Sequence, residues 1–310
     1  MIDAAELNNW EKILSRAHEN VEALTEKNVQ ETLVKVLRAL ELGLLRVASP
    51  PGTAPNCGVI KMEGDMREWT VHVWVKQAIL LAMRWRVSQE CGVVLSAANA
   101  QKSEASQGRI HNGPLHYFDK FDCRSDLNTV GVRVVPPAVV REGAHVAAGC
   151  ILMPSYVNIG AYVNAGTMVD TWATVGSCAQ IGQNVHLAGG VGIGGVLEPA
   201  GARPVLIGDN AFIGSRAIVV EGVCVGNGAV IGANVCLTAT TPLYDVTLPE
   251  KTEYRGYVPP LAVVAPGTRT KVFPGGEVQL QCGYIIGWRK PSTDAKVSLN
   301  DVLRETGISL

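Results

Sequence analysis

The chain has 310 residues, and its 27 basic and 28 acidic side chains give a net charge of −1. Such a balance argues against nucleic acid or a membrane surface as the main partner, because both attract basic proteins. The longest apolar run in the helical region, residues 78–83, is far too short to cross a bilayer. The acidic start, residues 1–6, has no secretion signal, and the eight cysteines form no CxxC pair. We therefore expect a cytoplasmic protein with reduced thiols.

The first part of the chain, residues 1–130, is predicted to be a mainly helical domain. Leucines recur there at helical spacing: Leu33, Leu37, Leu40 and Leu44. Asn28 and Glu31 resemble a capping box at the start of that helix. A Pro- and Gly-rich loop follows at residues 50–68. Residues 69–85 then predict a further helix, with Lys76 and Arg84 on its solvent-exposed side.

A six-residue repeat occupies the middle of the chain. Aliphatic residues recur every sixth position from Ile151 to Ile193, and again from Ile207 to Leu237. A second column, four positions later, holds small residues and valines: Ser155, Ala161, Thr167, Ala173, Ala179, Val185 and Val191, then Ala211, Ala217, Val223, Ala229 and Val235. This period fits neither an α-helix nor one long strand. It predicts a parallel β-helix, in which each repeat forms one flat side of a prism.

The repeat predicts a β-helix over residues 131–245 and leaves a tail at residues 246–310. Between Ile193 and Ile207 the register is broken by a Gly- and Pro-rich segment, residues 194–204, which is either a tolerated insertion or a loop that covers a cleft. The tail is predicted to be a small β-rich domain, with strands near residues 261–265 and 278–286. A short helix is expected near residues 299–304.

Three passages make the sequence more specific than a generic repeat. They are Arg133-Val134-Val135-Pro136-Pro137, Gly166-Thr167-Met168-Val169-Asp170-Thr171-Trp172, and Gly189-Gly190-Val191-Gly192-Ile193-Gly194-Gly195. Together with the passages around them, they closely resemble the 2,3,4,5-tetrahydrodipicolinate N-succinyltransferases of lysine and diaminopimelate biosynthesis. Residues 51–68 and 92–113 look like insertions relative to that family. The resemblance implies a left-handed prism, whereas ordinary parallel crossovers are right-handed.

The resemblance also implies a homotrimer with active sites between neighbouring prisms. By resemblance, Asp170 contacts the acceptor's nucleophilic group, and Arg133 and Arg216 bind the dicarboxylate acceptor. The co-substrate would be succinyl-CoA or acetyl-CoA, with no permanently bound cofactor and no metal. Candidate CoA contacts are small residues along the groove and one basic residue of the tail: Gly189, Gly190, Ser215, Ala217, Ala233 and Lys271.

Two departures from the family pattern bear on the acceptor. Ile218 stands where the family carries a second carboxylate, and Asn164-Ala165 replaces a family acidic pair. The main hypothesis is succinyl transfer to tetrahydrodipicolinate. The first alternative is a specialised paralogue that acylates a lysine-like amine in antimetabolite biosynthesis. The second is a trimeric scaffold that has lost its chemistry, although retention of Arg133, Asp170 and Arg216 favours an enzyme.

Acyl transfer to an amine needs a proton acceptor and a donor for the developing oxyanion. Asp170 is one candidate acceptor, because the amine proton becomes far more acidic once the amine has attacked the thioester. His186 is its rival, although a lone imidazole in a β-helix is more often structural. Cys178 is expected to be a packing residue. Only His145 and His186 lie in the prism, so a three-histidine zinc site is a poor alternative.

Overall fold

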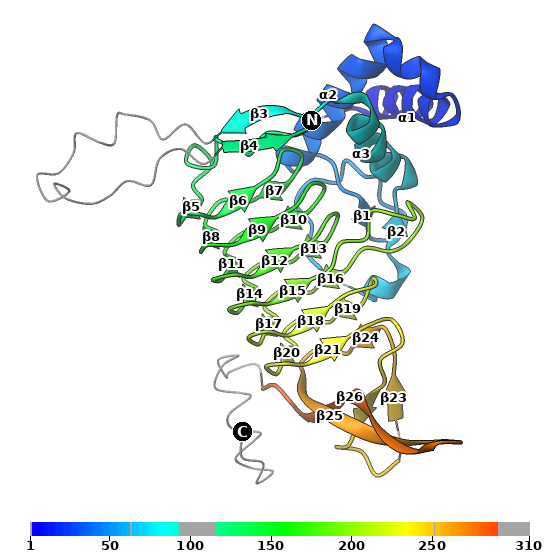
Figure 1. Ribbon diagram of the computed structural model, residues 1–310, viewed down its shortest axis with the longest axis vertical. Helices are drawn as coiled ribbons and strands as arrows, with labels where there is room; N and C mark the ends of the chain where they lie inside the picture. The colour runs from blue at the N-terminus through cyan, green and yellow to red at the C-terminus, as the bar shows by residue number, and fades with distance from the viewer. Residues whose placement is uncertain (1, 63, 93–115, 251, 291–310) are drawn as a thin grey trace, which may run out of the picture.

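The computed structural model describes residues 2–62, 64–92, 116–250 and 252–290 (Figure 1). Helices lie at one end of a long prism, and a β-hairpin extends from the other end. The helical elements of this end are α1 (Ala4–Glu19), the 3-10 helix η1 (Val21–Thr25), α2 (Lys27–Glu41) and α3 (Val73–Trp85). No helix among the described residues is long and apolar enough to cross a membrane.

The helices pack on one another through the leucine stripe that the sequence predicts. Leu33, Leu37 and Leu40 of α2 are buried in a common core with Trp10 of α1 and Ile79 of α3. The predicted capping box is wrong, because α2 begins at Lys27 and its N-cap position has no side-chain hydrogen bond. A different device opens α1, where the carboxylate of Asp3 accepts the Glu6 N–H at 2.8 Å.

The exposed position predicted for Lys76 is also wrong. Its side chain is fully buried, and its Nζ donates to the carbonyl oxygens of Val196 and Ala202, both at 2.6 Å. The ammonium group therefore ties α3 to the segment between Ile193 and Ile207. That segment packs against the helices, with Leu197 touching their core. A helical pattern read alone cannot reveal this burial, because the covering carbonyls come from a distant loop.

The prism has three flat faces built from two-residue strands. The β5 face contains β5 (Arg133–Val134), β8 (Ile151–Leu152), β11 (Met168–Val169), β14 (His186–Leu187), β17 (Phe212–Ile213), β20 (Val230–Ile231) and the start of β25 (Ala262–Phe273). The β6 face contains β6 (Val139–Val140), β9 (Tyr156–Val157), β12 (Thr174–Val175), β15 (Gly192–Ile193), β18 (Ile218–Val219) and β21 (Cys236–Leu237). The β7 face contains β7 (His145–Val146), β10 (Tyr162–Val163), β13 (Gln180–Ile181), β16 (Leu206–Ile207), β19 (Cys224–Val225) and β24 (Tyr257–Val258).

The core of the prism follows from this register. In each two-residue strand the second side chain points inward, because successive side chains alternate across a strand. These inward residues and the small-residue column form one buried cluster, which confirms the parallel β-helix. The last rungs come from β24 and β25, beyond residue 245, so the coil stack continues into the segment expected to be tail.

The segment between α2 and α3 covers the β7 face. Met62, Met66 and Trp69 are buried against Leu206 and Cys224. The short strands β1 (Ala48–Ser49) and β2 (Thr70–Val71) pair with each other, and the 3-10 helix η2 (Met66–Glu68) lies between them in the sequence. The segment that resembles an insertion thus closes this face to other partners.

Arg46 fastens that cover to the prism. Its guanidinium group is fully buried and stacks 3.8 Å from the ring centroid of Tyr162. Its Nε donates to Oε1 of Gln180 at 3.0 Å. Stacking on an aromatic face stabilises a cation that burial would otherwise penalise.

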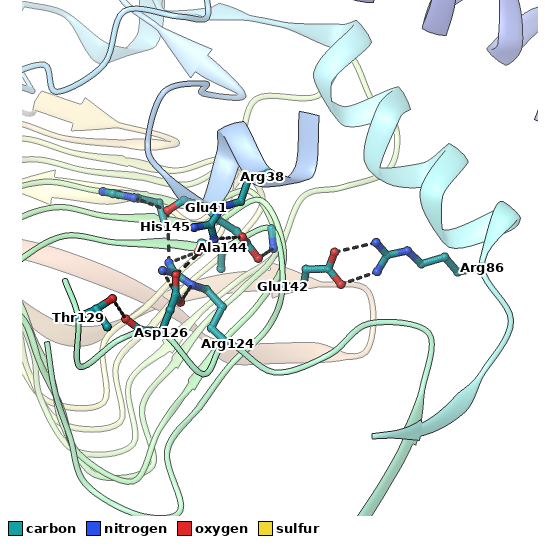
Figure 2. Close-up of polar contacts among 10 residues, drawn as sticks. Arg38, Glu41, Arg86, Arg124, Asp126, Thr129, Glu142, Ala144 and His145 are labelled. Carbon is teal, nitrogen blue, oxygen red and sulfur yellow. Dashed lines mark hydrogen bonds and ion pairs between the residues drawn. The ribbon is translucent and has the colours of Figure 1, made fainter. Parts of the chain in front are cut away.

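A charged junction joins α2 to the first coil (Figure 2). Arg124 donates to the carbonyl oxygens of Glu41 and Ala144 at 3.3 and 3.1 Å, and Arg86 forms a two-pronged ion pair with Glu142. Beside it, β3 (Gln89–Gly92) and β4 (His116–Asp119) form an antiparallel hairpin. The helical end is therefore fixed to the prism by both apolar and ionic contacts.

The C-terminal part forms a hairpin that extends from the last coil (Figure 1). Strand β25 pairs with β26 (Gly276–Trp288), and β26 pairs with β22 (Leu243–Asp245), which in turn pairs with β23 (Thr252–Tyr254). The predicted β-rich tail is present, with longer strands than the sequence suggested. The helix expected near residues 299–304 lies outside the described residues.

Candidate active site

The candidate site lies on the corner between the β5 face and the β6 face. Four successive turns of the prism form this Asp170 corner: residues 170–173, 188–191, 214–217 and 232–235. Coils are about 4.8 Å apart, the spacing of neighbouring strands. The β7 face is covered by the N-terminal segment, so this corner borders the two faces that the chain leaves uncovered.

Asp170 directly follows β11 and is held by its neighbour. Its Oδ1 accepts the backbone N–H of Thr171 at 2.7 Å and lies 3.3 Å from the Thr171 hydroxyl. Partial burial acts to raise the pKa of this carboxyl group, but the hydrogen bonds from Thr171 and the contact with His186 outweigh it, so the pKa lies below its usual value. Asp170 is therefore ionised at neutral pH.

His186 faces the other oxygen of this carboxylate. Its Nε2 lies 3.6 Å from Oδ2 of Asp170, and its ring packs edge-on against Phe212 with centroids 5.3 Å apart. The register explains this arrangement, because Met168 pairs with His186 and His186 pairs with Phe212 on adjacent strands. The two candidate bases of the sequence thus form one pair.

Most of the residues predicted to bind substrates share this corner. Gly189, Gly190, Ser215, Arg216 and Ala233 follow one another on the coils after Asp170. Ser215, Arg216 and Ala233 are exposed, and the two glycines are half-buried. The structure thus brings Asp170 and these five residues into one line along the prism.

Three predicted residues lie elsewhere or point elsewhere. Ala217 is fully buried in the prism core, with its N–H bonded to Gly214, so we correct its assignment from a CoA contact to a core residue. Arg133 is exposed on β5, two strands from β11, which places it about 10 Å along the same face. Lys271 lies on the hairpin, with its Nζ 5.0 Å from the ring centroid of Phe273.

Ile218, the residue at the departure from the family pattern, lies just past this corner on the β6 face. Its side chain is 43% exposed, in a column between Gly192 and Cys236. An aliphatic side chain so exposed, two residues after Arg216, gives that side of the corner an apolar surface.

Other candidate groups of the described residues do not form a second site of this kind. A hollow of about 660 Å³ lies at the junction of Figure 2, but its Arg38, Arg86, Arg124, Glu41 and Glu142 are engaged with protein partners. No group of three or more His, Cys, Asp or Glu side chains in the described chain is placed to hold a metal ion.

All eight cysteines are free, and Cys150, Cys178, Cys224 and Cys282 are buried. Cys178 is fully buried, and that burial raises the pKa of its thiol to about 12, so it is a packing residue, as expected.

Two family models match this chain. The model for the N-terminal part of tetrahydrodipicolinate N-succinyltransferase matches residues 9–85, and the model for the hexapeptide repeat of succinyl-transferase matches residues 204–239. A 2,3,4,5-tetrahydropyridine-2,6-dicarboxylate N-succinyltransferase from Delftia acidovorans is 43% identical over 289 residues, which cover 91% of this chain and 92% of the relative. The chain belongs to the tetrahydrodipicolinate N-succinyltransferase family.

A second relative agrees with this assignment. The enzyme of the same name from Nitrosomonas europaea is 42% identical over 303 residues and is matched over 96% of both chains. Among solved structures, a mutant perosamine N-acetyltransferase from Caulobacter crescentus with CoA and GDP-perosamine is 25% identical, with a TM-score of 0.29 over 35% of this chain and 50% of that chain. The match to the succinyltransferase family thus extends over both the helical end and the prism.

Sequence reasoning missed three residues of this candidate site. Thr171 holds Asp170, Phe212 holds His186, and Trp172 projects from the corner with 69% of its side chain exposed. A signal for Trp172 was present in the repeat: it occupies the same position of its coil as Gly190 and Arg216. Phe212 could be found only from the pairing of adjacent strands, and that pairing follows from the phase of the six-residue repeat.

Proposed function

We propose that this chain transfers the succinyl group of succinyl-CoA to the amine derived from 2,3,4,5-tetrahydropyridine-2,6-dicarboxylate. Its family relationship makes it an acyl-CoA-dependent acyltransferase. The observation that carries the proposal at the level of the site is the ionised, hydrogen-bonded carboxylate of Asp170 on the open corner. Its placement suits a group that must orient an amine and then receive a proton.

The chemistry needs a free amine at the acceptor. The ring nitrogen of a tetrahydropyridine is an imine, so addition of water to the C=N bond must precede acylation. The amine then attacks the thioester carbonyl, a C–N bond forms, and the C–S bond breaks to release the CoA thiol. The attacking nitrogen loses one proton to Asp170, directly or by way of His186 at 3.6 Å, and this proton then passes to the departing sulfur to give the thiol.

The charged groups suit a dicarboxylate acceptor. Arg216 lies on the Asp170 corner, and Arg133 lies about 10 Å along the β5 face. Guanidinium groups pair with carboxylates through two parallel hydrogen bonds. Gly189, Ser215 and Ala233 leave room along the corner for the pantetheine arm, and Lys271 on the hairpin is a candidate partner for the phosphates of CoA. Gly190 is covered by the side chain of Arg216, so we no longer assign it to CoA.

We further infer that the prism is left-handed and assembles as a homotrimer. The β7 face is covered by the chain's own N-terminal segment. The outward side chains of the other two faces include half-buried Ile151 and Met168 on the β5 face and exposed Tyr156 and Ile218 on the β6 face. A three-fold arrangement would bury these faces against neighbouring prisms and shelter the Asp170 corner between them.

The proposal is tested by following thiol release from succinyl-CoA with freshly prepared tetrahydropyridine-2,6-dicarboxylate. Wild type should turn over, and Asp170→Asn should lower kcat by ~10²-fold or more, the usual range for loss of an acid–base group. Acetyl-CoA in the same assay identifies the acyl donor. Thiol release no faster than hydrolysis of succinyl-CoA alone would reject the proposed function and favour the scaffold alternative.

A second candidate acceptor has one observation in its favour. Ile218 makes the corner beside Arg216 apolar, which suits an acceptor with an aliphatic side and an amine. A lysine-like amine is such an acceptor. Measuring kcat/KM for both acceptors decides between them.

A further inference from the structure

A column of residues with left-handed backbone runs along the Asp170 corner. Trp172, Gly190, Arg216 and Asn234 occupy equivalent positions, with φ of 61°, 70°, 58° and 59°. Backbone hydrogen bonds link successive coils: Gly190 N–H to Thr171 O at 2.8 Å, and Arg216 N–H to Gly189 O at 3.0 Å. Trp172 and Arg216 are thus two coils apart, about 10 Å, with Gly190 between them.

Gly190 has no side chain, and the side chain of Arg216 occupies the space above it. A Cβ atom built on Gly190 would lie 3.1 Å from Cγ of Arg216 and 3.8 Å from its Nη1. The side chain of Arg216 therefore lies across the bare backbone of Gly190, with its guanidinium group directed toward the coil of Trp172. Any side chain at position 190 would push it away.

The backbone of Trp172 has an unfavourable left-handed conformation. Left-handed backbone costs roughly 1–2 kcal/mol for a residue with a Cβ atom. The indole is also 69% exposed, so it stabilises the prism little in return. Asn at the equivalent position 234 is the usual solution for such a corner. A strained, exposed aromatic residue two positions from Asp170 indicates a role in binding.

We propose that Trp172 and Arg216 bind the acceptor together, with Gly190 allowing Arg216 to lie toward Trp172, and that Trp172 is a specificity-determining residue for an amino-dicarboxylate. The inference rests on the proposed function and adds the residue that positions the acceptor. The amine lies at Asp170, one carboxylate pairs with Arg216, and the carbon skeleton packs on the indole face between them.

The chemistry of the two side chains suits the acceptor. The aliphatic skeleton of the acceptor packs on the indole face, and a carboxylate is the natural partner of a guanidinium group. Because Arg216 lies toward the coil of Trp172, one small molecule can reach both side chains.

Kinetics of Trp172 variants test the inference. Trp172→Ala should raise the acceptor KM about tenfold, a loss of about 1.4 kcal/mol, while the succinyl-CoA KM stays within a factor of two. Trp172→Phe keeps an aromatic face and should lose less. Gly190→Ala should also raise the acceptor KM, because it displaces Arg216. Trp288→Ala, a half-exposed tryptophan at the base of the hairpin, is the matched control and should change neither constant.

A binding measurement separates this inference from the proposed function. The saturated analogue piperidine-2,6-dicarboxylate should shift the tryptophan emission of wild type and of Trp288→Phe to shorter wavelength, and leave that of Trp172→Phe unchanged. Absence of turnover in wild type rejects the proposed function. Turnover with an unchanged acceptor KM in Trp172→Ala, or with a raised succinyl-CoA KM instead, overturns this inference alone. Dissociation of the Trp172→Ala assembly would assign the indole to a contact between copies and overturn it too.

Discussion

The imidazole Nε2 of His186 lies 3.6 Å from the carboxylate Oδ2 of Asp170, across adjacent strands of the β5 face. Thr171 holds the other oxygen of the carboxylate, and Phe212 packs against the imidazole ring. We therefore expect Asp170 and His186 to act as one unit, because a change in either side chain should alter the position and charge of the other.

We expect His186→Gln to reduce kcat about tenfold and to move the acid limb of the pH–kcat/KM profile upward. The contact with His186 lowers the pKa of Asp170, so its removal lets that pKa rise and Asp170 lose its charge at a higher pH. Phe212→Leu is the matched control, because it removes the ring contact and keeps the imidazole. An acid limb at the wild-type pH in His186→Gln would show that the histidine is only structural.

Ile218→Glu should reveal which acceptor the corner is built for. A regained hydrogen-bonding partner is worth ~1–3 kcal/mol. If the chain is specialised for a lysine-like amine, the substitution should shift relative kcat/KM toward tetrahydropyridine-2,6-dicarboxylate by roughly 5- to 150-fold. Ile218→Gln separates the effect of charge from that of polarity. Efficient wild-type turnover of the dicarboxylate, with little gain in Ile218→Glu, would sink the specialised alternative.

Lys76→Met should loosen the segment between Ile193 and Ile207. The variant keeps the length of the side chain and removes the donor for the carbonyls of Val196 and Ala202. Leaving buried carbonyls without a donor costs about 1–3 kcal/mol each, partly offset by removal of a buried charge. Hydrogen exchange should rise in residues 194–204. Arg84→Met, on the exposed side of the same helix, should leave exchange there unchanged.

Stability should fall as the pH drops from about 6.5 to about 4. Burial lowers the pKa of both His72 and His145 to about 4, so the folded chain keeps them neutral in a range where the unfolded chain binds protons. Linkage then makes stability rise with pH across that window. The urea midpoint at pH 5 and pH 7.5 measures this, and His145→Asn should reduce the difference. A midpoint independent of pH would contradict it.

The assembly should be a trimer at micromolar concentration, measured by light scattering at neutral pH. Tyr156→Glu on the uncovered β6 face should weaken it, because it places a charge on an exposed side chain that the trimer would bury. A charge introduced on the covered β7 face would disturb folding and cannot serve as a control. Lys27→Glu at the helical end is therefore the charge-changing control. A monomeric wild type would contradict the prediction.

Much of this protein is specified by the six-residue period alone. A small residue or valine four positions after each aliphatic one fits only a short strand and a tight corner, so the parallel β-helix follows directly. The same phase brings Asp170, Gly190, Arg216 and Ala233 onto one corner, because each coil turns at the same place in the repeat and the turns stack at the strand spacing. Resemblance to the family added the chemistry, which no period encodes.

Only the tertiary structure decided which distant segments cover the faces of the prism and which charged side chains meet. Lys76 is buried because the loop at residues 194–204 folds over it, and the β7 face is closed because Met62, Met66 and Trp69 pack on it. The 3.6 Å contact between His186 and Asp170 depends on side-chain directions at the ends of two strands. A one-dimensional pattern reports which face a residue occupies, and only packing against distant segments determines what covers that face and which charges meet there.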